Sequence, residues 1–119
     1  MKKYDILKTE RFHSMYARVE TVCVNDGMTV KRLVSYGNVV CDMNMDTRTV
    51  YLYHRYQYGS VTVRHVTRFL NEFAPLAYGQ WTIALIRYTQ DNSDSDGHAT
   101  LCKYDVCFRD YVLGTQCGW

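Results

Sequence analysis

The densest gathering of side chains able to do chemistry lies in the middle of the chain. The run 51–58 reads Tyr-Leu-Tyr-His-Arg-Tyr-Gln-Tyr, and arginines follow at positions 64 and 68. Tyrosine and arginine offer large, stiff contact area with hydrogen-bonding tips, which suits a protein interface or the stacking of nucleic-acid bases. Because strands also favour tyrosine, half of these rings could instead cover a sheet edge or pack under a helix. The partner-binding cluster that the sequence predicts is Tyr51, Tyr53, Arg55, Tyr56, Tyr58, Arg64 and Arg68.

A second group of residues could support nucleophilic catalysis. Ser60, Thr62 and His65 are close in sequence, and a histidine can activate a hydroxyl when a third group orients it. Hydroxyls at the start of a helix usually cap it, however, and the same histidine can be an ordinary packed or exposed residue. The sequence also contains neither a glycine-rich phosphate loop nor a paired acid signature. We therefore expect a protein that is not an enzyme.

Two patterns resemble metal sites at first and then fail. The loop 92–97, Asn-Ser-Asp-Ser-Asp-Gly, matches the start of a calcium loop, but Lys103 stands where a bidentate carboxylate is required. Zinc needs thiolates or imidazoles at tight spacing, whereas four residues separate Cys102 from Cys107 and no second pair accompanies them. We expect a solvated hairpin turn, separate thiols, and no metal or cofactor.

Composition restricts the cellular compartment of the protein and the kind of partner that it can bind. The five cysteines are an odd number without the regular spacing of a disulfide scaffold, and we interpret them as reduced thiols. The sequence has no run of about 18 apolar residues and no signal-peptide pattern, so we expect no membrane span and a cytoplasmic protein. The net charge of +2, from 14 basic and 12 acidic residues, is too balanced for binding nucleic acid mainly through phosphates.

The elements that must position the cluster are strands and one helix. Strands near 15–24 and 28–36 flank the hairpin signal Asn25-Asp26-Gly27, and half-buried strands follow near 39–45 and 48–54. Apolar residues then change to helical spacing over 60–73, where Ser60 or Thr62 is a plausible N-cap and Pro75 ends the helix. Arg64 and Arg68 lie on the polar side of that helix.

Two further strands, near 80–89 and 99–108, are predicted to form a hairpin around the loop 91–97. The length of 119 residues is typical of one domain. The sequence thus predicts a single α+β domain over 1–119, an antiparallel sheet of about six strands with one amphipathic helix packed on it, in the order β-β-β-β-α-β-β.

The direction of the tyrosines depends on the register between the strands 39–45 and 48–54. A loop of two or four residues pairs Val50 and Leu52 with Met43 and Cys41, and it places Tyr51 and Tyr53 on the other face, which we expect to be exposed. A loop of three residues would reverse this parity.

Part of the chain resembles a family of small uncharacterised proteins from phages and mobile elements of Gram-positive bacteria. The resemblance rests on Ser35-Tyr-Gly-Asn-Val-Val40, on Tyr51, and on the stretch 60–70, which begins with Ser and Thr and continues through His65 to Phe69-Leu70. The family usually has a second threonine where this sequence has Val63. The resemblance covers about a third to a half of the chain and implies a setting, namely an accessory protein acting inside a bacterium.

These observations lead to two hypotheses about function. The first is a non-enzymatic, phage-encoded binding protein whose partner is a host protein or ribonucleoprotein complex. In the setting that the resemblance implies, such a protein would inhibit a bacterial defence system such as a CRISPR effector. The alternative is a nucleic-acid-binding phage accessory protein that uses the same cluster. Salt dependence separates the two, because nucleic-acid affinity falls steeply with salt.

Overall fold

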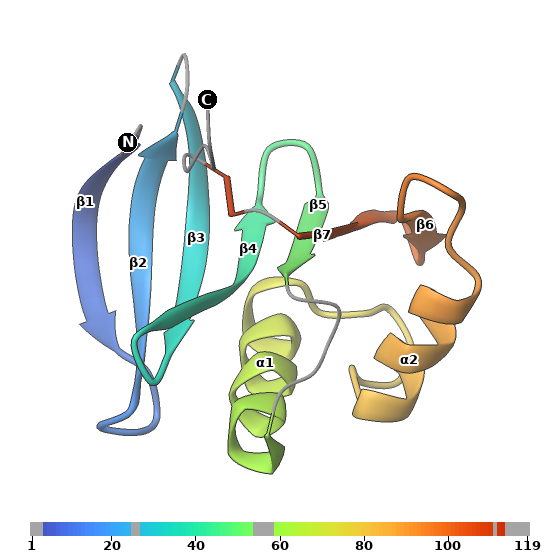
Figure 1. The fold of residues 1–119 in the computed structure, drawn as a ribbon, viewed down its shortest axis with the longest axis horizontal. Coiled ribbons are helices and arrows are strands. Elements are labelled where there is room, and N and C mark those ends of the chain that lie inside the picture. Colours follow the sequence, from blue (N-terminus) through green and yellow to red (C-terminus); the bar gives the residue numbers. More distant parts are fainter. Residues whose placement is uncertain (1–3, 25–26, 54–58, 111, 114–119) are drawn as a thin grey trace.

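Seven strands form one sheet in the order β1-β2-β3-β4-β5-β7-β6. The computed structural model describes residues 4–24, 27–53, 59–110 and 112–113. Neighbouring strands are antiparallel except β5 and β7, which are parallel because the chain passes through two helices between them (Figure 1). The strands are β1 (Tyr4–Arg11), β2 (Ala17–Val24), β3 (Met28–Ser35), β4 (Asn38–Asn44), β5 (Thr49–Tyr53), β6 (His98–Leu101) and β7 (Tyr104–Arg109).

Two helices lie on the same face of this sheet, which we call the helix face. They are α1 (Ser60–Phe73) and α2 (Ile83–Asp91). Their apolar side chains meet a row of residues that stand opposite one another in neighbouring strands. Because side chains alternate along a strand, this row belongs to one face from β2 to β7. It consists of Val19, Leu33, Cys41, Leu52 and Phe108.

The adjacent row of the sheet points to the other face, which we call the open face, and it is polar. It runs through Glu20, Arg32, Asp42, Tyr51, Cys107 and His98. A smaller apolar cluster also lies on the open face, where Val22, Val24 and Val30 pack against Leu113. The open face is therefore partly covered by residues 112–113, at the end of the described chain. Neither helix is long and apolar enough to cross a membrane, within the residues that the structure describes.

Much of the expected architecture is confirmed. The fold is α+β, the sheet is mostly antiparallel, and α1 occupies 60–73 and ends before Pro75 as predicted. The pairs Cys41↔Leu52 and Met43↔Val50 confirm the register with a four-residue loop.

The order of the elements was predicted wrongly in three places. The strand β1 was not predicted, since its side chains are almost all exposed and show no alternation. The expected strand 80–89 is instead occupied from residue 83 by the helix α2, whose first turn is capped because Thr82 Oγ1 accepts from Leu85 N at 3.1 Å. The expected strand 99–108 is two strands joined at Cys102 and Lys103, which adopt φ angles of 48° and 72°. Left-handed non-glycine residues leave no turn signal in a sequence.

Candidate functional site

The structure does not bring the described members of the predicted cluster together. Tyr51 and Tyr53 lie on the open face of β5. Arg64 and Arg68 lie on the exposed side of α1, which packs against the helix face. The sheet therefore separates the tyrosines from the arginines, while Arg55, Tyr56 and Tyr58 are outside the described residues.

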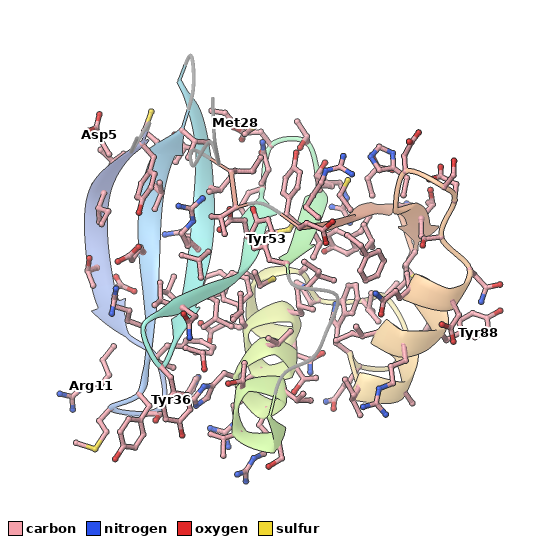
Figure 2. The ribbon with its side chains drawn as sticks, in the orientation of Figure 1. Asp5, Arg11, Met28, Tyr36, Tyr53 and Tyr88 are labelled. Carbon is pink, nitrogen blue, oxygen red and sulfur yellow. The ribbon has the colours of Figure 1, made fainter. Side chains whose placement is uncertain are left out.

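Tyr53 corrects the expectation that both tyrosines are exposed. Its exposed fraction is 0%, and its hydroxyl donates to Asp42 Oδ2 at 2.6 Å and accepts from Leu113 N at 3.3 Å. Figure 2 shows Tyr53 near the middle of the molecule. The parity of the strand was predicted correctly, but the open face carries a second buried layer at this point. Tyr51 is half-buried. A partner cannot reach Tyr53 without displacing the chain around Leu113.

The layer beneath Leu113 is a buried ionic network. Arg32 donates from Nε and Nη2 to the two oxygens of Asp42 at 2.8 and 2.9 Å, and Nη2 also reaches Leu113 O at 2.6 Å. The guanidinium lies 4.7 Å from the centre of the Tyr4 ring, and its Nη1 has no hydrogen-bond partner among the described residues. Burial raises the pKa of Asp42, although Arg32 and Tyr53 oppose that rise. These contacts hold the end of the described chain against the sheet.

A serine, a threonine and a histidine do meet, but not in a catalytic arrangement. Ser35 Oγ lies 2.9 Å from His65 Nδ1 and 3.0 Å from Thr62 Oγ1. Ser35 is 1% exposed, so a substrate cannot reach its hydroxyl. No acidic side chain of the described chain hydrogen-bonds the imidazole. Burial lowers the pKa of His65, with smaller contributions from Arg64 and Arg68. The three side chains attach the first turns of α1 to β3.

The same contacts correct the expected helix cap. The N-cap of α1 is Gly59, which has no side chain to cap the helix, and the Thr62 hydroxyl is directed to Ser35.

In the loop that resembles a calcium site, the Asp94 carboxylate hydrogen-bonds backbone N–H groups of nearby residues. Asp94 Oδ1 accepts from Asp96 N at 2.8 Å and from His98 N at 3.0 Å, which is the pattern of an Asx turn. These hydrogen bonds lower the pKa of Asp94, the one from His98 most strongly. Among the described residues, no three His, Cys, Asp or Glu side chains are grouped as metal ligands.

The most unusual exposed feature is a pair of stacked tyrosines that the sequence did not single out. The rings of Tyr16 and Tyr36 are 5.0 Å apart at an interplanar angle of 15°, and the residues are 54% and 51% exposed. Met15 beside them is 74% exposed. The pair borders an open hollow of about 400 Å³. We call the residues lining this hollow the tyrosine surface: Met15, Tyr16, Ala17, Arg18, Tyr36 and Gly37.

Tyr36 is held in a strained position by the turn between β3 and β4. Ser35 pairs with Asn38, so Tyr36 and Gly37 form a two-residue hairpin loop, with φ angles of 50° and 80°. Such loops favour Asn-Gly, and a bulky residue with positive φ costs free energy. The backbone NH of Tyr36 donates to Tyr16 O at 2.8 Å, which ties the turn to the neighbouring loop. The turn thus carries an exposed aromatic ring on a strained backbone position.

Arginines surround the tyrosine surface. Arg11 stands directly opposite Arg18 in the β1/β2 pair, and Arg18 Nε donates to Glu20 Oε2 at 2.9 Å. Figure 2 shows Arg11 and Tyr36 at the same end of the molecule. His65 lies on the other side, its ring 6.1 Å from that of Tyr36 and within the electrostatic influence of Arg64 and Arg68. Arg11 and Arg18 therefore lie at the end of the molecule that carries the stacked rings, and Arg64 and Arg68 lie on the helix whose His65 approaches Tyr36.

One sequence signal could have pointed to this surface. In the sequence, Tyr36-Gly37 occupies a hairpin position where Asn-Gly is usual. The stacking with Tyr16 depends on the pairing of β2 with β3 and is not visible in the order of residues.

No protein-family model matches the sequence, and no curated protein or solved structure is significantly similar to it.

Proposed function

We propose that the protein is a non-enzymatic binding protein that contacts a partner protein through the tyrosine surface. The observation that carries this proposal is the exposed Tyr16 and Tyr36 stack, built on a turn whose backbone favours a different residue. Tyrosine and arginine are the residues most enriched at energetically important positions of interfaces. A strained turn that displays an aromatic ring is better explained by binding than by stability.

Arg64 and Arg68, from the cluster that the sequence predicts, remain part of this proposal. They lie on α1 beside His65, which contacts Tyr36. Arg55, Tyr56 and Tyr58 precede the same helix in sequence and stay a prediction.

The resemblance to phage proteins supports a host protein or ribonucleoprotein complex as the partner. It also supports inhibition of a bacterial defence system as the outcome, in the cytoplasm of the host. Nucleic acid is the second candidate partner, because Tyr16 has a ring face away from Tyr36 on which a base could stack.

The proposal is tested by capture of partners from a nuclease-treated bacterial lysate, with quantitative mass spectrometry. The baits are the parent protein, Tyr16→Ala and Tyr36→Asn, with Tyr78→Ala as the control because Tyr78 is 90% exposed outside the tyrosine surface. Loss of an anchor of this type costs about 2 kcal/mol, which is roughly thirtyfold in affinity. A protein retained by the parent and the control, and lost by both surface variants, is the expected result. Equal recovery by all four baits would place the binding surface elsewhere.

A further inference from the structure

We propose that the partner presents an acidic protein segment to the tyrosine surface. This inference rests on the proposed binding function and adds the chemistry of the partner.

The charges around the tyrosine surface are mainly positive and unpaired. Arg11, Arg64 and Arg68 form no ion pair with any residue in the described ranges. Of the nearby acids, Glu20 is buried against Arg18, and Glu72 lies 3.5 Å from His13. Free arginines around exposed aromatic rings complement a partner that carries carboxylates.

Acidic residues gather on a different part of the molecule. The loop between α2 and β6, and the strand β7 next to it, lie across the molecule from β1 and β2 (Figure 1). They contain three acidic residues, Asp94, Asp96 and Asp105, and one basic residue, Arg109. The net charge of the whole chain is small because acidic residues at one end of the molecule offset basic residues at the other. The tyrosine surface lies at the basic end.

The stacked rings favour a protein over a nucleic acid. Tyr36 has Tyr16 on one side at 5.0 Å and His65 on another at 6.1 Å, with interplanar angles of 15° and 33°. Sequence-tolerant binding of single strands relies on free ring faces, one for each base. Because Tyr16 covers one face of the Tyr36 ring and His65 lies close to the ring, we infer that Tyr36 meets a partner mainly through its edge and hydroxyl. Those are the parts of tyrosine that contact peptide groups and carboxylates at protein interfaces.

Two arrangements that lower the stability of the folded protein occur near the tyrosine surface. Tyr36 occupies a left-handed position, and Arg11 stands opposite the like-charged Arg18. Like charges directly opposite in a sheet are destabilising. Because Glu20 already pairs with Arg18, Arg11 is the one of the two that pairs with no carboxylate of the described residues, and an acidic segment would supply one on binding.

The test uses three fluorescein-labelled probes and fluorescence anisotropy at low and physiological salt. The probes are a decaglutamate peptide, a glycine-serine peptide of the same length, and a fifteen-nucleotide single strand of thymidine. The proteins are the parent, Tyr36→Asn, Tyr16→Ala and an Arg64→Ala/Arg68→Ala double variant. The control is an Arg87→Ala/Tyr88→Ala double variant on the exposed side of α2. Tyr36→Asn creates the Asn-Gly pair that this turn favours, so its fold should be retained.

The expected result is that decaglutamate binds the parent and the control equally, and binds each surface variant at least tenfold more weakly. The neutral peptide should bind at least tenfold more weakly than decaglutamate to the parent. Failure of decaglutamate to bind the parent, or equal binding by all variants, would overturn the proposal. Tighter binding of the oligonucleotide, lost in the same variants, would replace it with nucleic-acid recognition. If capture from lysate depends on Tyr36 while decaglutamate does not bind, the binding function stands and the acidic partner is rejected.

Discussion

At the scale of single residues, the network of Arg32, Asp42 and Tyr53 shows how a polar row becomes part of the core. The Asp42 carboxylate is fully buried and receives two hydrogen bonds from Arg32 and one from Tyr53. A buried charge of this kind is tolerated only when it is paired and hydrogen-bonded. Each donor to Asp42 is therefore needed for stability.

We expect Tyr53→Phe to lower the free energy of unfolding by about 2 kcal/mol, because it removes a hydrogen bond to a buried charged group. The matched control is Tyr51→Phe, on the same face of β5 but half-buried, which should change stability by less than about 0.5 kcal/mol. Urea unfolding followed by circular dichroism measures both. An equal effect of the two substitutions would show that the Tyr53 hydroxyl bond contributes nothing specific.

His65 makes stability depend on pH in a defined direction. Burial lowers its pKa in the folded protein, so between that pKa and the ordinary value of about 6.5 the unfolded chain binds more protons. The stability contributed by neutral His65 is therefore complete above about pH 6.5 and is lost as the pH falls toward the folded pKa. We expect the stability difference between the parent and His65→Asn to shrink on acidification through this window. Urea unfolding at a series of pH values measures it, and a difference that stays constant would contradict the assignment.

At the scale of elements, two glycines differ in whether the structure leaves room for a side chain. Gly59 caps α1 in an ordinary extended conformation, and a Cβ placed there would meet no atom within 4 Å. Gly97 has φ +78°, and a Cβ there would lie 2.6 Å from Phe108 O. The first position tolerates a side chain, and the second does not.

We expect Gly59→Asp to stabilise the protein by about 0.5–1 kcal/mol, since an aspartate can accept from the free N–H groups of the first turn and favours the helix dipole. Gly97→Ala should destabilise it by roughly 1–3 kcal/mol, because of the positive φ and the contact with Phe108. Thermal and urea unfolding of the two variants test the pair. Destabilisation by Gly59→Asp would mean that the start of α1 is not as described.

At the scale of the whole molecule, the core is continuous from β2 to β7. Apolar residues of five strands and both helices form one cluster. The four cysteines within the described residues, Cys23, Cys41, Cys102 and Cys107, are free. Burial raises the pKa of Cys41 well above its usual value, which keeps that thiol protonated and unreactive.

We therefore expect the melting temperature to stay within about 2 °C when a chelator or a reductant is added, because neither agent removes a contact of this core. Differential scanning calorimetry of the parent with each agent measures this. A large drop with the chelator would reveal a structural metal, and a large drop with the reductant would reveal a disulfide.

The sequence by itself determined the elements whose signals are local. The helix over 60–73 follows from apolar spacing and Pro75, and alternation predicts the strands 39–45 and 48–54, whereas the loop length that pairs Cys41 with Leu52 is left open by the sequence and is decided by the structure. Exposed strands such as β1 and left-handed non-glycine turns carry no such signal. Only the tertiary structure decided what covers each face. Tyr53 is buried because Leu113 crosses the open face, and Tyr16 meets Tyr36 because β2 pairs with β3. Such contacts depend on which distant segments meet, and residue type and spacing do not encode them individually.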